Sequence, residues 1–205
     1  MVADSTDNTA SIVAGKVEQF ADLDLLEPGP RVGKGRDVRA GMLKASGSVI
    51  VFMDADLATP LKNLNLFYES CRRNHGIAIG TRNIRKHRKN IFRYLLSNAG
   101  NLLFRITGGL WIEDSQCGFK MFSKKAARIC FGKQTIMGWS FDMEILAIAR
   151  INHLPIESIR VDDWEHKPGG TFEDHLFTNG VHSLVDFLKI LYKRMTGKYK
   201  FKGAK

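Results

Sequence analysis

The chain has 205 residues, a length that fits one domain with a sizeable hydrophobic core. Its hydrophobic fraction of 44% and charged fraction of 25% are ordinary for a globular protein, and no run of residues is apolar over the length that a membrane-spanning helix needs. The three cysteines, at positions 71, 117 and 130, have no metal-binding spacing, and their odd number favours a reducing compartment. We therefore expect a cytoplasmic protein without a cysteine-held metal.

The net charge of +10 is concentrated in two blocks. Residues 71–112 contain no Asp or Glu but nine basic side chains, and residues 189–205 form a second basic block. Such patches attract polyanions, so nucleic acid, an anionic membrane and a phosphorylated substrate are all open as partners at this point.

Strand-like and helical patterns alternate along the chain, after a possible strand end at residues 1–3. Hydrophobic periodicity and capping residues predict helices over residues 10–20, 33–46, 59–67, 91–106, 141–151 and 181–195. Short apolar runs predict strands over residues 49–53, 76–80, 119–122 and 156–164. Residues 81–90 and 171–178 are predicted loops. The alternation predicts an α/β fold with a mostly parallel sheet flanked by helices and right-handed crossovers.

The most informative stretch is the apolar run Val49–Met53 followed by Asp54, Ala55 and Asp56. The run predicts a strand that is buried on both faces. Open α/β sheets bind ligands beyond the carboxyl ends of their strands, where two carboxylates can hold Mg²⁺ together with substrate phosphates. The alternative is an ordinary turn, which one Asp alone would not distinguish from a site.

Four segments together resemble a known family. Residues 33–42 (GKGRDVRAGM) and 53–57 (MDADL) resemble the inverting, family-two glycosyltransferases of the GT-A (Rossmann-like) fold. Residues 114–122 (DSQCGFKMF) and 138–144 (GWSFDME) narrow the resemblance to the branch of dolichyl-phosphate β-glucosyltransferases and dolichyl-phosphate mannosyltransferases. The resemblance extends over nearly the whole chain.

The resemblance implies roles at the donor side of the site. Asp54 and Asp56 match the metal and diphosphate motif, with Asp56 as the more direct ligand and a catalytic residue. Asp4 matches the acidic residue that faces the base or ribose, although the surrounding Asp-Asp-Gly-Ser pattern is only partly kept. Lys34 matches a basic residue beside the nucleotide. The implied cofactor is Mg²⁺ or Mn²⁺.

Other matches concern the sugar and the acceptor. Arg82 matches a position near the donor, and Asp114 and Gln116 match residues that line the sugar and acceptor side. A lipid phosphate is already anionic, so it needs cations rather than a general base. Arg85 and Arg93 would supply such cations, and we expect Asp114 to orient the sugar rather than to act as a base.

The resemblance implies transfer of a hexose, with inversion, from a nucleotide sugar (UDP-glucose or GDP-mannose) to a polyprenyl phosphate of the dolichyl type. The enzyme would be peripheral at the cytoplasmic face of a membrane, and a basic amphipathic C-terminal helix would bind its anionic surface. A same-fold enzyme with a hydroxyl acceptor and a non-catalytic truncated homologue are alternatives. A nucleic-acid-binding protein ranks low, because the basic segment over residues 82–89 lacks interleaved aromatic residues, and we expect no nucleic-acid partner.

One family feature has no match: an opening strand with Pro-x-Tyr-Asn-Glu. We therefore expect residues 1–178 to form an N-terminally incomplete glycosyltransferase domain, and residues 179–205 to form the amphipathic helix and tail.

Some residues have a plain structural interpretation. Trp139 and Phe141 are expected in the core, and Cys117 is expected to be a small buried residue. Asp142 and Glu144 are either a solvated helix start, favoured by the helix dipole, or supports of the site.

Overall fold

The computed structural model describes residues 7–27, 29–82, 109, 112, 114–164 and 176–201, with residues 176–181 described by their backbone alone. The helices are α1 (Thr9–Val17), α2 (Lys34–Lys44), α3 (Leu64–Asn74), α5 (Lys124–Lys133), α6 (Phe141–Ile151) and α7 (Leu176–Met195), with a 3₁₀ turn η1 (Leu61–Asn63) before α3. The strands are β1 (Val49–Met53), β2 (Ile77–Arg82), β3 (Phe119–Ser123) and β4 (Ile156–Val161).

The four strands form one sheet in the order β1-β3-β2-β4. Strand β3 is antiparallel to both neighbours, with Val51 opposite Met121 and Ile77 opposite Phe122. Strand β4 is parallel to β2. Three of the four strands therefore run in one direction, which confirms the α/β fold, but two of the three strand pairings are antiparallel, so the sheet is mixed rather than mostly parallel. However, β1 and β2 are not neighbours, because the later strand β3 lies between them.

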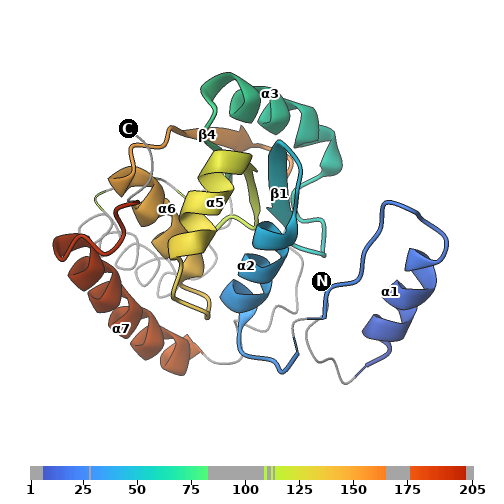
Figure 1. Cartoon of the computed structure of the whole chain (residues 1–205), viewed down its shortest axis with the longest axis horizontal. Coiled ribbons are helices and arrows are strands. Elements are labelled where there is room, and N and C mark those ends of the chain that lie inside the picture. Colours follow the sequence, from blue (N-terminus) through green and yellow to red (C-terminus); the bar gives the residue numbers. More distant parts are fainter. Residues whose placement is uncertain are drawn as a thin grey trace.

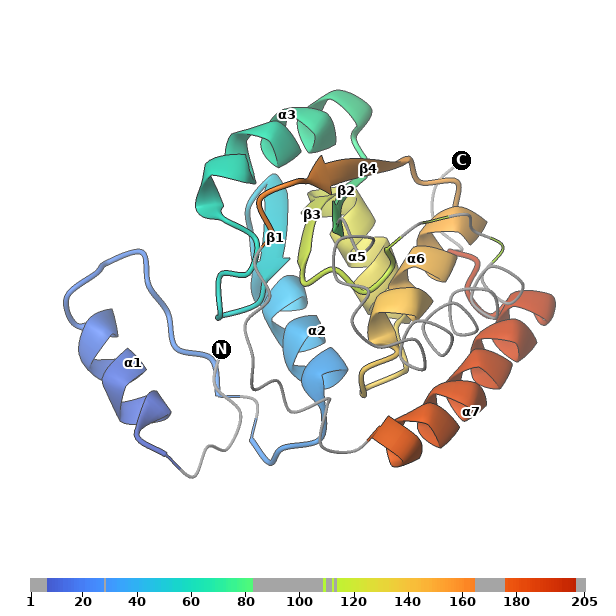
Figure 2. The ribbon, with the colours of Figure 1, turned by 180° about the vertical axis from the view of Figure 1, so that it is seen from behind.

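Helices cover both faces of the sheet (Figures 1 and 2). Helix α3 lies over one face, where Phe67 packs with Phe119 and Met121. Helices α2, α5 and α6 lie over the other face, where Ile50 and Phe122 belong to the larger apolar cluster. The alternation of side chains along each strand produces this division, because successive residues point to opposite faces.

The predicted burial of the first strand on both faces is wrong. Ile50 and Phe52 are buried, but Val51, which points to the opposite face, is 37% exposed. Strand β1 is the outer strand of the described sheet, so its second face has less cover. The helix predicted over residues 59–67 also begins later: Thr59 is buried, Pro60 occupies the N-cap position of η1 without a side-chain cap bond, and α3 itself begins at Leu64.

The first and last helices of the described chain differ in how they pack against the rest of the molecule. Helix α1 stands apart from the sheet and contains no buried residue (Figure 1). Helix α7 instead packs beside α6, and its Phe187 and Ile190 belong to the larger apolar cluster together with Tyr199. The proposed domain boundary at residues 178 and 179 stays a prediction. Within the described residues, no helix is both long and apolar enough to cross a membrane.

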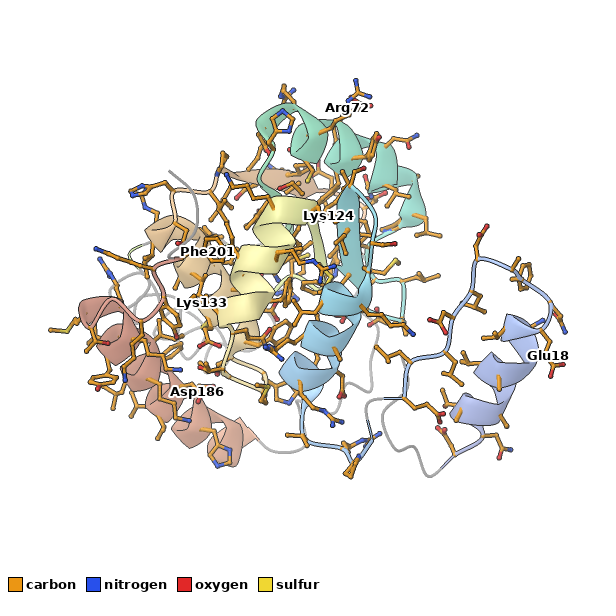
Figure 3. The ribbon with its side chains drawn as sticks, in the orientation of Figure 1. Glu18, Arg72, Lys124, Lys133, Asp186 and Phe201 are labelled. Atoms are coloured by element: carbon orange, nitrogen blue, oxygen red, sulfur yellow. The ribbon has the colours of Figure 1, made fainter. Side chains whose placement is uncertain are left out.

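The helix α5 was not predicted, although Ser123 caps it by accepting a hydrogen bond from the Ala126 backbone N–H. Lys124 and Lys133 mark its two ends (Figure 3). Several predictions lie outside the described residues: the strand end at 1–3, the basic segment beyond Arg82, and the helix over 91–106.

Candidate active site

The two aspartates follow β1 directly, in a turn at the carboxyl end of the strand. The Asp54 backbone N–H donates to the carbonyl of Gly118 over 2.9 Å, which extends the β1–β3 pairing by one residue. Asp56 is exposed, and its Oδ1 accepts from the Ala58 backbone N–H over 3.0 Å. Both carboxylates are therefore held near the strand end while retaining oxygen atoms that can bind a ligand.

The Asp54 carboxylate lies directly against the backbone of Gly118. A Cβ atom built on Gly118 would meet Asp54 Oδ2 at 1.8 Å and Cγ at 2.3 Å. Any larger residue at position 118 would therefore displace the carboxylate, so glycine is required for this close approach.

Lys34, the first residue of α2, pairs with this carboxylate. Its Nζ lies 2.5 Å from Asp54 Oδ1 and 5.3 Å from the centre of the Trp139 ring. Gly35 lets α2 approach closely, because a Cβ there would meet Phe141 Cβ at 2.6 Å. The expectation of a core Trp139 is wrong: the residue is 38% exposed, and its ring lies against the lysine, whereas Phe141 is fully buried as predicted.

Arg82, the last residue of β2, makes a second pair with Asp114. Its Nε and Nη2 donate to the two carboxylate oxygens over 2.5 and 2.8 Å, and its backbone N–H donates to Oδ2 over 3.1 Å. Burial lowers the pKa of Arg82, but the hydrogen bonds and charge of Asp114 raise it overall. Asp114 is only 3% exposed, so the sequence-predicted residues Arg82 and Asp114 form one rigid bidentate unit.

Two buried hydroxyls lie beside this pair in the sequence. Among the residues that the structure describes, Thr81 Oγ1 and Ser115 Oγ are buried without a hydrogen-bond partner. Buried polar atoms usually have partners, so these two unsatisfied hydroxyls are exceptions next to Arg82 and Asp114 in the sequence. Gln116, the next residue, is exposed on the same segment.

A third ion pair, between Lys120 and Asp142, is more deeply buried than the other two. Lys120 in β3 is fully buried; its Nζ donates to Asp142 Oδ1 and to the Cys117 carbonyl over 2.5 and 2.6 Å, beside the Phe52 ring. Burial raises the pKa of Asp142, although the charge of Lys120 acts in the opposite direction. The solvated alternative for Asp142 is therefore wrong.

Sequence reasoning did not single out Lys120. Its signal was a lysine within an apolar strand, between Phe119 and Met121, which demands a buried partner. Cys117, whose carbonyl Lys120 holds, is buried as predicted, and burial raises the pKa of its thiol, with a further contribution from Asp114. Lys120 thus links α6 to the segment that carries Asp114 and Gly118.

Glu144, the second acidic residue in the first turn of α6, has a different environment. Glu144 is fully buried and accepts hydrogen bonds from Thr135 N and Oγ1, Ile136 N and Tyr199 Oη. The solvated alternative is wrong for Glu144 as well, since four donors satisfy its carboxylate.

The described residues contain no group of three or more His, Cys, Asp or Glu side chains that could hold a metal. Two carboxylates at a strand end suit Mg²⁺ or a similar ion only when substrate phosphates complete its coordination. Asp4, Arg85 and Arg93 lie outside the described residues, so their predicted roles stay predictions.

Comparisons with known proteins agree on one family. The model of glycosyl transferase family 2 matches residues 3–130. Dolichyl-phosphate β-glucosyltransferases are similar: one from Trichomonas vaginalis is 29% identical, covering 91% of this chain and 58% of that protein. Those from Dictyostelium discoideum and Homo sapiens are 28% and 29% identical, covering 97% and 84% of this chain. The chain spans only 58% to 63% of the first two relatives' lengths.

Solved structures agree on the fold. Glucosyl-3-phosphoglycerate synthase from Mycobacterium tuberculosis in complex with UDP superimposes with a TM-score of 0.61 at 16% identity, over 92% of this chain and 66% of that one. The complex of that synthase with Mn²⁺, UDP and glucosyl-3-phosphoglycerate gives a TM-score of 0.59 at 17% identity. The fold, the Asp54–Asp56 strand end and a family match over more than half of the sequence lead to one conclusion: the chain belongs to glycosyl transferase family 2.

Proposed function

We propose that this chain carries the catalytic site of a glycosyltransferase that moves glucose from UDP-glucose to a polyprenyl phosphate of the dolichyl type. The observation that carries the proposal is that the Lys34–Asp54 and Arg82–Asp114 pairs lie at the same edge of the sheet, where β1 and β2 end on either side of β3. The similarity to dolichyl-phosphate β-glucosyltransferases supports glucose and dolichyl phosphate, and the UDP complexes of the structural neighbour support a uridine nucleotide.

The donor side would be built on Asp54, Asp56 and Lys34. A divalent ion such as Mn²⁺ or Mg²⁺, held by the carboxylates and the diphosphate, would stabilise the charge of the leaving nucleoside diphosphate. An ion bound at Asp54 Oδ1 would displace Lys34 from that oxygen. The released ammonium group would then lie beside the diphosphate, where it offsets negative charge.

The acceptor side favours a phosphate nucleophile. Asp114 accepts three hydrogen bonds from Arg82 and is almost fully buried, so it is poorly placed to take a proton from a hydroxyl acceptor. A phosphate oxygen needs no general base and would attack the anomeric carbon in one inverting displacement. The carboxylate then keeps Arg82 in place for the sugar, together with Gln116.

The test is a transfer assay with dolichyl phosphate, Mn²⁺ and either UDP-glucose or GDP-mannose. We expect glucosyl lipid from UDP-glucose only, and a loss of about 100-fold or more in Asp56→Asn. Asp24→Asn, which removes the same charge at an exposed position outside the site, is the matched control. Transfer to a hydroxyl acceptor, or UDP binding without any transfer, would reject the proposal in favour of the corresponding alternative.

We further propose that the protein acts as a peripheral protein at the cytoplasmic face of a membrane. Helix α7 has an outward apolar face, although its opposite side packs on the core. Its exposed members are Leu184, Val185, Leu188, Tyr192 and Met195. The adjacent lysines would attract anionic headgroups while this face enters the interface.

Vesicle-binding assays distinguish specific binding by this face of α7 from nonspecific hydrophobic binding. Leu188→Asp is expected to weaken binding to anionic vesicles, whereas Leu66→Asp, which changes an equally exposed leucine on α3, is not. Binding is also expected to fall at high salt. Equal binding to neutral vesicles, or equal loss in both variants, would contradict the proposed surface.

A further inference from the structure

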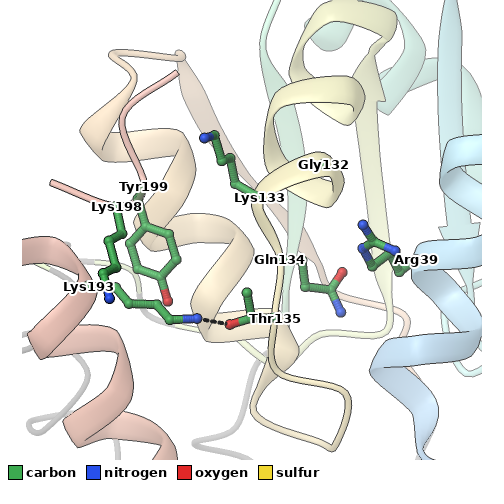
Figure 4. A pocket seen from close by; sticks show the side chains of 8 residues that line it. All are labelled: Arg39, Gly132, Lys133, Gln134, Thr135, Lys193, Lys198 and Tyr199. Atoms are coloured by element: carbon green, nitrogen blue, oxygen red, sulfur yellow. Dashed lines mark hydrogen bonds between the residues drawn. The ribbon is translucent and has the colours of Figure 1, made fainter. Parts of the chain in front are cut away.

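A basic pocket is lined by residues other than those of the candidate active site (Figure 4). It has a volume of about 400 Å³ and sits where the end of α5 meets α2 and the segment after α7. Its lining residues are Arg39, Gly132, Lys133, Gln134, Thr135, Lys193, Lys198 and Tyr199. None of them is a predicted active-site residue, so the pocket is a separate feature.

Four of the lining side chains are cations and none is a carboxylate. Arg39 donates from Nε to the Phe131 carbonyl over 2.8 Å, and Lys193 donates to Thr135 Oγ1. Lys198 approaches the Tyr192 hydroxyl at 3.5 Å, while Lys133 makes no hydrogen bond or ion pair within the described residues. These partners are uncharged, so the positive charge of the pocket has no anion among its lining residues.

Two acids near the pocket do not change this conclusion. Glu144 accepts hydrogen bonds from the lining residues Thr135 and Tyr199, and four donors already occupy its oxygens. Asp186, whose charge also acts on Tyr199, is paired with Lys189 outside the pocket, so two carboxylates do not balance the four lining cations. An anion entering the pocket would therefore relieve the repulsion between the cations.

Gln134 adds a second, independent feature. It is 3% exposed, and its Nε2 donates to the carbonyls of Gly35 and Ile136, each over 2.8 Å. Its Oε1 is buried without a hydrogen-bond partner in the described residues. Because Nε2 is fixed by two carbonyls, the amide cannot turn to hide this oxygen. A ligand hydroxyl is the donor that would satisfy it.

We infer that this pocket binds a phosphate ester of a polyol: the cations hold the phosphate, and Gln134 Oε1 accepts from a hydroxyl. A lipid headgroup such as that of phosphatidylinositol and a soluble polyol phosphate share this chemistry. The inference does not rest on the proposed transferase activity, since the lining residues lie outside that site.

Calorimetric titration of the protein with inositol 1-phosphate and with inorganic phosphate tests the pocket. Inositol 1-phosphate is expected to bind more tightly, because only it offers hydroxyls. Lys133→Gln/Lys198→Gln is expected to weaken its binding by about tenfold or more, the size expected for lost charge-assisted hydrogen bonds. Lys124→Gln/Lys125→Gln removes the same charge from exposed positions of α5 and should bind as the unaltered chain does.

The same two variants identify the source of the ligand in vesicle sedimentation. If phosphatidylinositol vesicles bind the control variant but not the pocket variant, the ligand is a lipid headgroup. If free inositol 1-phosphate shows this difference and vesicles do not, the ligand is soluble. Equal weakening in both variants, or no binding of either probe by the unaltered chain, would overturn the inference.

Discussion

Gly118→Ala tests whether the close contact between Gly118 and Asp54 sets the geometry of the donor site. The new Cβ would lie 1.8 Å from Asp54 Oδ2, whereas real Cβ atoms essentially never come within 3.0 Å of such an atom. The carboxylate must therefore move by about 1.2 Å, and its 2.5 Å contact with Lys34 must change with it. Displacements of about 1 Å in a catalytic group can reduce the rate about 100-fold.

The expected result is a loss of about 100-fold in kcat/KM with UDP-glucose and weaker Mn²⁺-dependent UDP binding, while the KM for the acceptor is retained. The fold should persist, because Asp54 is partly exposed and can turn; we expect a cost of about 1 kcal/mol in the free energy of unfolding. Gly15→Ala on α1, where a new Cβ meets nothing within 4 Å, is the control. Full activity in a correctly folded Gly118→Ala protein would refute the reasoning.

Three other outcomes are expected. Lys120→Met should lower the free energy of unfolding by about 3–5 kcal/mol in urea titrations, because Asp142 is left buried and unpaired. The double variant Lys120→Met/Asp142→Leu should regain part of the lost stability, and a larger loss in the double variant would contradict this account. Arg82→Lys should cost about 2 kcal/mol by the same measurement, since the two-pronged contact with Asp114 is lost, and an unchanged midpoint would argue against it. Burial raises the pKa of Cys71 from 9.0 to about 11, so iodoacetamide should label it at pH 8 only on unfolding, and stability should fall as pH rises from about 9 to about 11. Rapid labelling of the folded protein would show that Cys71 is accessible.

Local patterns predicted most elements because their signals are short-range. The helix over residues 141–151 matches α6 without error, and the apolar run at 49–53 matches β1. The position of β3 could not be predicted this way, because strand order depends on which strands pair in space. The exposure of Val51 has the same origin: apolar composition does not show whether a strand has cover on both faces.

The candidate site shows a similar division. Lys34, Asp54, Arg82 and Asp114 were predicted from motifs, because each motif is a short local run of residues: Lys34 begins a helix, Arg82 ends a strand, Asp54 follows a strand, and Asp114 lies in the segment before β3. Their pairing was not predicted, because it joins residues 20 and 32 positions apart in the chain.

The sequence by itself determined the alternation of strands and helices and the acidic strand end, because hydrophobic periodicity and residue chemistry are local properties. Only the tertiary structure showed that Lys120 is buried and paired with Asp142, that position 118 has no room for a Cβ atom beside Asp54, and that four cations line one pocket. Those features depend on distances between segments that are remote in the sequence, and packing alone sets such distances.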